Sequence, residues 1–266
     1  MKIIEIVKFI LIGFVQGISE VLPISSSAHL LIIGSVLDLN VDITLEIILH
    51  FASLISVVFF MRKKIGLLIK EIYLFVIKKE MQYKKSFLYV IYLIVSSLIL
   101  VFTTLLINDY IEMVFNRLYI VGILLVINGI ILFLFTGFTR NKNEIKFRDS
   151  IIIGLFESIG VFPGISRSGI TLSGCNVCGI NKDEASDYAF LLFIPATLGA
   201  FVYKIDSFDY NFIKSNIYGY ILGFFTTIIV TYLSFSLLLK IIKKRKINIF
   251  GYYCIIVGLI VYLLNI

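Results

Sequence analysis

Ionisable side chains and cysteines are scarce in this chain of 266 residues. Asp, Glu, Lys and Arg together make up 15% of it, and it holds two histidines and three cysteines. Three cysteines do not support a disulfide scaffold. Cys175 and Cys178 have CxxC spacing, but neither a second ligand pair nor a solvated loop accompanies them. We therefore expect buried thiols that act as small apolar residues, not a metal or redox site.

Hydrophobic residues make up 59% of the chain and fall in repeated apolar runs. Runs of about 20 residues are long enough to cross a hydrocarbon layer of roughly 30 Å. They are apolar on every face, unlike the alternating strands of a membrane barrel. No Ala-x-Ala-like cleavage site follows the first run, so we expect it to belong to the mature protein. These features predict an all-α polytopic integral membrane protein. The clearest spans are 45–61, 87–107, 118–138, 185–203, 217–239 and 249–264.

The net charge of +7 is distributed unevenly along the chain. Of the 24 Lys and Arg residues, 18 lie in four segments. These segments are 61–85, 139–149, Lys182 and 240–246. This asymmetry follows the positive-inside rule and assigns the four segments to the cytoplasm. The basic balance therefore reflects topology and attraction to anionic lipids, and it argues against a nucleic-acid partner. We expect residues 65–77 to lie at the membrane interface.

Two polar islands, 16–29 and 157–171, interrupt the apolar sequence. An ionisable side chain at the bilayer centre costs roughly 2.5 to 3.5 kcal/mol, so such residues mark a functional site. The islands also resemble each other, because Gly13 and Gln16 match Gly154 and Glu157 in spacing. In both islands a proline is followed by serines.

The stretches 1–40 and 150–180 hold one island each, and neither fits an ordinary span. Residues 150–180 lie between two cytoplasmic segments and must return to the side they enter from. We predict two re-entrant helix pairs and six transmembrane helices, arranged as inverted-topology repeats. The chain 1–266 would form a single membrane domain, with repeats of about 1–138 and 139–266.

The islands predict an anion site. We expect Pro23 and Pro163 in the first turn of a new helix and the serines after them at capping positions. Two helix N-termini would then meet near the membrane centre and attract an anion. Arg167 adds a fork of donors that suits phosphate. The hydroxyl groups that could add further donors are those of Ser166, Ser168 and Thr171.

The same islands hold groups for phosphoryl transfer. Glu20 and Glu157 could hold a divalent cation, or one of them could act as a base. Ser26 or His29 could attack, and His29 shares a helical face with Ser26. His50 lies on an unbroken span, and we expect it to be structural. Two further pairs are four residues apart: Gln16 and Glu20 share a helix face, and Gly13 and Gly17 allow a close helix approach.

These residues resemble the bacterial undecaprenyl-pyrophosphate phosphatase family, also called the bacitracin-resistance family. The similarity rests on Glu/Gln-x-x-x-Glu at 16–20, Pro-x-Ser-Ser-x-x-His at 23–29 and Pro-Gly-x-Ser-Arg-Ser-x-x-Thr at 163–171. It extends over nearly the full length. The resemblance implies hydrolysis of the C55 isoprenoid pyrophosphate to the monophosphate, with Mg²⁺ or Ca²⁺, recycling the lipid carrier for cell-wall synthesis. It places the site at the outer face of a bacterial plasma membrane.

The residue patterns and the resemblance together define the candidate site, and the resemblance itself implies Glu20, Ser26, His29, Ser166, Arg167, Ser168 and Thr171. Glu20, Ser26, His29 and Arg167 are the candidate catalytic residues, and Glu20 and Glu157 are the candidate metal ligands. The candidate substrate-binding residues are Gln16, Ser25, Ser27, Glu157, Ser166, Ser168 and Thr171. Membrane lipids are expected partners, and a homodimer is a candidate assembly.

Departures from the family pattern are few. Gln16 stands where the family often has Glu, and Glu157 where it often has Gln. We hypothesise that one carboxylate has changed sides of a shared cavity. Ala28, often Gly in the family, affects only the local backbone fit.

Three other classes of protein were compared with the hydrolase: a transporter, a phosphatase of another superfamily and a structural membrane protein. A transporter or flippase for a polyprenyl phosphate suits inverted repeats around a central anion site, and nothing in the sequence excludes it. A phosphatase of the phosphatidic acid type 2 superfamily would need a further His with an Asp partner. No His follows position 50. A purely structural membrane protein needs no buried Arg.

Overall fold

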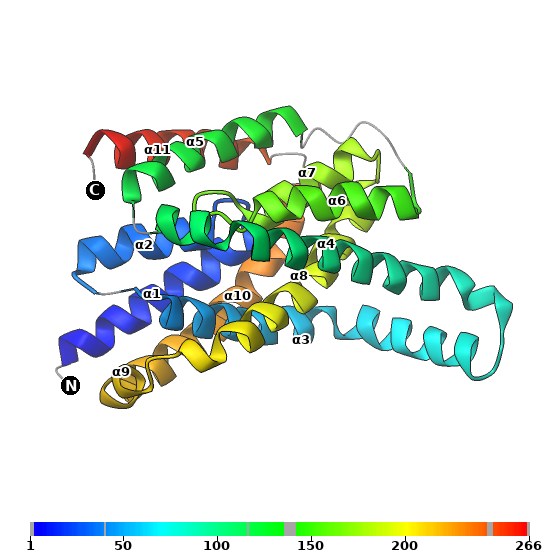
Figure 1. Cartoon of the computed structure of the whole chain (residues 1–266), viewed down its shortest axis with the longest axis horizontal. Helices are drawn as coiled ribbons and strands as arrows, with labels where there is room; N and C mark the ends of the chain where they lie inside the picture. The colour runs from blue at the N-terminus through cyan, green and yellow to red at the C-terminus, as the bar shows by residue number, and fades with distance from the viewer. Residues whose placement is uncertain (1–2, 40, 116, 136–141, 244–246, 265–266) are drawn as a thin grey trace.

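The computed structural model describes residues 3–39, 41–115, 117–135, 142–243 and 247–264 as an assembly of helices (Figure 1). The α-helices are α1 (Ile3–Val21), α2 (Ser26–Leu37), α3 (Ile43–Val76), α4 (Lys84–Phe115), α5 (Leu118–Phe135), α6 (Phe147–Ile159), α7 (Arg167–Val177), α8 (Lys182–Lys204), α9 (Tyr210–Ser215), α10 (Ile217–Lys243) and α11 (Asn248–Leu264). Two short 3-10 turns, Met81–Tyr83 and Ile205–Ser207, adjoin α4 and α8. The all-α prediction is confirmed for the described residues.

Four segments of the described chain are long and apolar enough to cross a membrane. They are Ile43–Val76, Met81–Ile111, Lys182–Ser207 and Ile217–Ile241. The other two expected spans are α5 and α11, with 18 and 17 residues. Both are apolar but shorter, so a total of six crossings stays a prediction.

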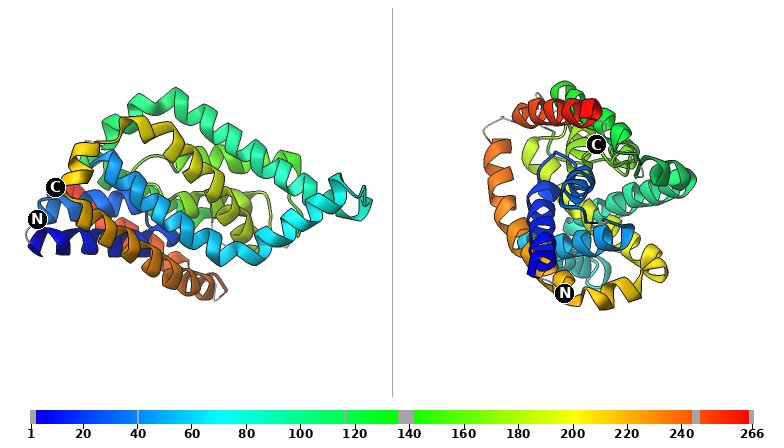
Figure 2. Two further views of the ribbon diagram at one scale, coloured as in Figure 1. Left: turned by 90° about the horizontal axis from the view of Figure 1, so that it is seen from below. Right: turned by 90° about the vertical axis from the view of Figure 1, so that its left-hand side faces the viewer.

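Helix α3 extends well beyond the expected span of 45–61. Residues 65–76, which we expect to lie at the membrane interface, continue this helix without a break. Residues 65–76 contain no proline that would end the helix, and their single glycine, Gly66, does not interrupt it. In Figures 1 and 2 the joined ends of α3 and α4 project together beyond the other helices.

Glycines set the helix packing around the islands. Helix α1 packs along α10, α6 along α4, and α5 along α11. A Cβ atom on Gly13 would lie 2.3 Å from the Gly223 carbonyl oxygen, and one on Gly17 would lie 2.7 Å from Val230 Cβ. Any larger side chain at Gly13 would therefore push α10 away. The expected close approach at this glycine pair is confirmed.

Each polar island forms two helices separated by a short loop. Residues 22–25 separate α1 from α2, and residues 160–166 separate α6 from α7. The expectation that Pro23 and Pro163 begin new helices is wrong, because both lie within these loops. A proline disfavours helical geometry in the residue before it, so each one helps to keep its loop out of the helix.

Candidate active site

The loops of the two islands touch each other directly. The Gly164 backbone N–H donates to Ser25 Oγ at 3.0 Å, and Ser168 Oγ donates to the Leu22 carbonyl at 3.5 Å. Ser25 has φ of 69°, a left-handed conformation that is uncommon for a residue other than glycine. Its hydroxyl does not cap α2 and instead reaches the other loop. The structure thus brings together two segments that are about 140 residues apart in sequence.

The start of α7 follows the expected capping pattern. Ser166 is the N-cap, and its Oγ accepts a hydrogen bond from the Gly169 N–H at 3.2 Å. Ser166 Oγ also lies 3.2 Å from Ser168 Oγ. Arg167 is the first residue of the helix, so its side chain leaves from the positive end of the helix dipole. An anion placed there would meet backbone donors, hydroxyls and a guanidinium together.

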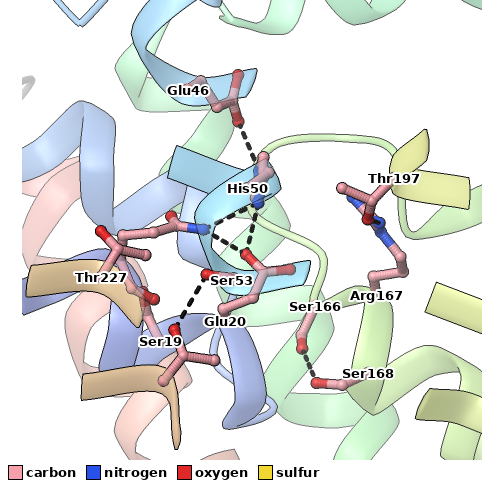
Figure 3. A network of polar contacts seen from close by, with 12 residues as sticks. Ser19, Glu20, Glu46, His50, Ser53, Ser166, Arg167, Ser168, Thr197 and Thr227 are labelled. Atoms are coloured by element: carbon pink, nitrogen blue, oxygen red, sulfur yellow. Dashed lines mark hydrogen bonds and ion pairs between the residues drawn. The ribbon is translucent and has the colours of Figure 1, made fainter. Parts of the chain in front are cut away.

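Glu20 is held in a polar network on the α1 and α3 side of the site (Figure 3). Its Oε2 atom accepts a hydrogen bond from Gln16 Nε2 at 2.6 Å and lies 2.6 Å from His50 Nδ1. On the far side of the same imidazole, Glu46 Oε1 lies 3.5 Å from His50 Nε2. His50 therefore joins the site, although the sequence pattern predicted a structural role.

Arg167 lies across the site from this network (Figure 3). Its Nη1 donates to Thr197 Oγ1 at 3.1 Å, and its guanidinium lies 5.1 Å from the centre of the Phe193 ring. The guanidinium is thereby anchored to α8. Thr197 and Phe193 both belong to α8, so this helix positions the arginine that the second island supplies.

Two small cavities lie between Glu20 and Arg167, and both residues line each of them. The first is polar and is lined by Ser19, Glu20, Ser25, Ser26, Ser27, His50, Gly160, Ile165, Ser166 and Arg167. The second combines polar and apolar groups and is lined by Glu20, Val21, Val57, Arg167, Ser168, Thr171, Ala189, Phe190 and Phe193. Each has a volume of about 20 Å³. That is room for one water molecule or ion, so the site is closed in this structure.

A wider hollow of about 410 Å³ lies elsewhere, between residues 64–71 of α3 and 85–92 of α4. Lys64, Glu71, Lys85 and Glu144 are among its lining residues, and none of the predicted site residues is. Two of its three lysines are already paired, Lys64 with Asp187 at 2.9 Å and Lys85 with Glu144 at 2.5 Å. We therefore place the chemistry in the smaller cavities.

Neither cavity is lined by Gln16, His29 or Glu157, and only the second is lined by Thr171. His29 Nδ1 lies 2.8 Å from the Ser25 carbonyl, its Nε2 lies 2.8 Å from Tyr253 Oη, and it lines neither cavity. Glu157 also lines neither cavity, and its Oε2 is buried without a hydrogen-bond partner among the described residues. Thr171 lines the second cavity, but its hydroxyl donates to the Arg167 carbonyl at 2.8 Å.

The donor set can be compared with the needs of a divalent cation. Within the described residues, no three His, Cys, Asp or Glu side chains are placed to hold a metal ion together. Glu20 faces the cavities with a carboxylate, and Glu157 has an unpaired buried oxygen. One or two carboxylates suit Mg²⁺ when phosphate oxygens of a substrate complete its shell. The residues fit a cation that arrives with a diphosphate better than a permanently bound one.

Sequence reasoning missed two residues of the site. His50 stands one helical turn after Glu46, and this i, i+4 pair was a usable signal. Asn128 lies in the apolar helix α5, is fully buried and bonds to both loops. A lone buried amide in an apolar run needs partners. The sequence shows that Asn128 needs hydrogen-bond partners, but it does not show which groups they are.

The fold and site define a multi-pass helical membrane protein in which a partly buried arginine and a largely buried carboxylate line the same small cavities between two broken helices. Residues 9–260 match the family model described as bacitracin resistance protein BacA, and the chain belongs to this family.

Relatives in the family match over nearly their full lengths. A protein of Methanosphaera stadtmanae named undecaprenyl-diphosphatase is 33% identical, with 99% of each chain covered. Undecaprenyl-diphosphatase 3 of Bacillus anthracis is 31% identical, with 96% of each chain covered. Undecaprenyl-diphosphatase of Methanobrevibacter smithii is 33% identical, with 97% of each chain covered. The relatives include archaeal as well as bacterial proteins, so the family does not fix the expected bacterial source.

Proposed function

We propose that this protein hydrolyses undecaprenyl diphosphate to undecaprenyl phosphate and inorganic phosphate, and that it thereby confers bacitracin resistance. The observation that carries the proposal is the shared lining of both cavities by Glu20 and Arg167, one from each island. Phosphoryl transfer needs a clamp for negative charge and an aligned nucleophile. The second island supplies the clamp, and the first island supplies the nucleophile.

The clamp comes from the second island. Arg167 and the N-terminal end of α7 would bind the terminal phosphate, with Ser166 and Ser168 as hydroxyl donors. Ser25 and Ser27 line the polar cavity and would bind from the first island. Because these donors are fixed by loops and helix ends, they need little reorganisation as charge develops.

The nucleophile comes from the first island. Ser26 lies beside the Glu20 carboxylate on the wall of the polar cavity. Ser26 Oγ would bond to the terminal phosphorus while the bridging P–O bond breaks, the lipid monophosphate leaves, and Glu20 takes the serine proton. Water would then hydrolyse the phosphoserine and release inorganic phosphate. His29 remains the alternative nucleophile, although Tyr253 would first have to release its Nε2.

A divalent cation would be held by Glu20 together with the diphosphate, with Glu157 as a second ligand. Bound there, Mg²⁺ or Ca²⁺ would neutralise part of the phosphate charge. Gln16 would orient Glu20 through its 2.6 Å hydrogen bond.

The second cavity suits the start of an isoprenoid chain. Val57, Ala189, Phe190 and Phe193 form its apolar wall, next to Arg167. A diphosphate carries many more atoms than a volume of about 20 Å³ accepts, so α3 and α8 must separate when substrate enters.

The membrane arrangement is proposed as six transmembrane helices and two re-entrant helix pairs, with the site open to the outer face. Helix packing supports inverted repeats. Helix α1 packs on α10 and α6 packs on α4, as they must if α1 corresponds to α6 and α4 to α10. The short helices α5 and α11 pair with each other, as equivalent helices near a two-fold axis do. The proposal places the protein in the plasma membrane with its cation-rich loops inside.

Phosphate release from purified protein tests this function. We expect the wild type in detergent, given undecaprenyl diphosphate and Mg²⁺, to release one phosphate per lipid. Arg167→Ala should lower kcat by about 100-fold or more, as loss of a charge-stabilising donor does elsewhere. Arg117→Ala is the matched control, because Arg117 is exposed, and its Nη1 donates to the Tyr119 hydroxyl at 3.4 Å.

A second assay separates hydrolysis from transport. Vesicles that contain the protein are loaded with labelled undecaprenyl phosphate in one leaflet, and its appearance in the other leaflet is followed. Movement of lipid by a protein that releases no phosphate, with or without Arg167, would overturn the hydrolase proposal in favour of a transporter.

A further inference from the structure

Asn128 joins the two loops of the site through one side chain. Its Nδ2 donates to the Pro23 carbonyl of the first loop at 3.2 Å, and its Oδ1 accepts from the Ser166 N–H of the second loop at 3.0 Å. The side chain is fully buried. Asn128 belongs to α5, so a third element holds the loops together at a point behind the cavities.

Only a side-chain amide satisfies this position. Pro23 presents a carbonyl oxygen that needs a donor, and Ser166 presents an N–H that needs an acceptor. Asn carries both on one planar group, whereas Leu carries neither and an ionised Asp carries only acceptors. Without the amide the Ser166 N–H would lose its partner, and the Pro23 carbonyl would keep only the weak donor Cys254 Sγ at 3.8 Å. Unpaired buried groups are costly.

The surroundings of Asn128 fix its position. Cys254 of α11 accepts a further hydrogen bond from Nδ2, with Sγ at 3.3 Å. Gly129 packs so close to α11 that a Cβ atom there would lie 2.6 Å from the Gly251 carbonyl oxygen. The second loop rests on α5 as well, because a Cβ atom on Gly164 would lie 2.5 Å from Leu124 Cβ. The α5–α11 pair is therefore a rigid platform beneath both loops.

We infer that Asn128 is a positioning residue that sets the distance between the two halves of the active site. Ser166 directly precedes Arg167, and Pro23 lies three residues before Ser26 and three after Glu20. A shift of either loop against α5 therefore moves the phosphate clamp relative to the nucleophile. The amide touches neither cavity itself.

This inference rests on the proposed hydrolase activity, and three variants test it. We expect Asn128→Leu to lower kcat by about 100-fold, the loss that a displacement of about 1 Å can cause. Asn128→Asp keeps an acceptor for the Ser166 N–H and should lose less, about tenfold. Ser96→Ala is the matched control, because Ser96 is equally buried and its hydroxyl bonds to the Ser150 carbonyl and Tyr188 Oη, neither of which belongs to the two loops.

A binding measurement separates positioning from a merely structural role. The probe is farnesyl methylenediphosphonate, whose P–C–P bridge cannot be hydrolysed, and the readout is the rise in unfolding temperature on binding. Asn128→Leu should lose most of this rise, and Ser96→Ala should keep it even if its own unfolding temperature falls. A kcat of Asn128→Leu within threefold of wild type, or an equal loss of kcat in Ser96→Ala, would overturn the inference. A wild type that binds the probe without releasing phosphate from undecaprenyl diphosphate would contradict the proposed function instead.

Discussion

His50 Nδ1 and Glu20 Oε2 lie 2.6 Å apart, and both side chains are largely buried. They come from α3 and α1, so this pair ties the first polar island to a long membrane helix. Glu46 lies on the other side of the imidazole. A carboxylate held in this way keeps one orientation toward the cavity, and catalytic groups depend on such orientation.

Replacing His50 should therefore impair catalysis. We expect His50→Ala to lower kcat by about 10- to 100-fold, because it leaves the Glu20 carboxylate free to turn within the cavity. His50→Gln retains a hydrogen-bond donor and should recover much of the loss. The measurement is the steady-state rate of phosphate release, with Glu46→Gln as the control for the far side of the ring. Equal losses in the Ala and Gln variants would refute the orienting role.

The identity of the nucleophile can be settled by trapping. We expect rapid quenching in SDS at neutral pH, with substrate labelled in the terminal phosphate, to yield a phosphoenzyme. Its label should survive later treatment with acid, as a phosphoserine at Ser26 would. Ser26→Ala should remove both the label and turnover. If the label is instead labile to acid and persists in Ser26→Ala, the attacking residue is His29. Absence of any trapped label would point to direct attack by water.

The unpaired oxygen of Glu157 leads to a prediction about charge. In the proposed repeats Gln16 and Glu157 occupy equivalent places. Each has one buried oxygen without a hydrogen-bond partner among the described residues. If a carboxylate at either place serves the same cation, Glu157→Gln should raise the Mg²⁺ concentration needed for half-maximal activity. The double variant Gln16→Glu with Glu157→Gln should then return this Mg²⁺ concentration to the wild-type value.

Titration with Mg²⁺ after chelation measures that concentration for each variant. Gln16→Glu alone serves as the comparison, because it adds a carboxylate without removing one. Unchanged turnover in Glu157→Gln together with faster turnover in Gln16→Glu would contradict the exchange of sides.

Local patterns in the sequence were sufficient to locate the broken helices. Prolines, serines and ionisable residues within apolar runs predicted an interruption at Pro23 and at Pro163, since a proline and a capping serine act over one or two turns. The structure has these interruptions at 22–25 and 160–166. The serine cap was confirmed at Ser166, and Glu20 and Arg167 do share a cavity.

Residues whose role depends on a distant partner were not predictable in this way. His50 lies 30 residues after Glu20, and Asn128 bonds to residues 105 and 38 positions away. Their local sequence resembles any buried membrane helix. Helix α3 also continued past residue 65, because cations and apolar residues are compatible with a helix whether it lies inside the membrane or beyond it.

Gly164 provides the last prediction, which concerns the second loop and its seat on α5. Its φ is 108°, in a region that side chains with a Cβ atom rarely adopt, and a Cβ atom there would lie 2.8 Å from the Val121 carbonyl oxygen. We expect Gly164→Ala to destabilise the protein by about 1 to 3 kcal/mol and to lower kcat, because the loop must move off α5. Gly199→Ala is the matched control, since nothing lies within 4 Å of its Cβ position on α8. That variant should be neutral or slightly stabilising. Thermal unfolding in detergent and phosphate release measure both effects, and a Gly164→Ala protein as stable and active as Gly199→Ala would show that this glycine does not hold the loop against α5.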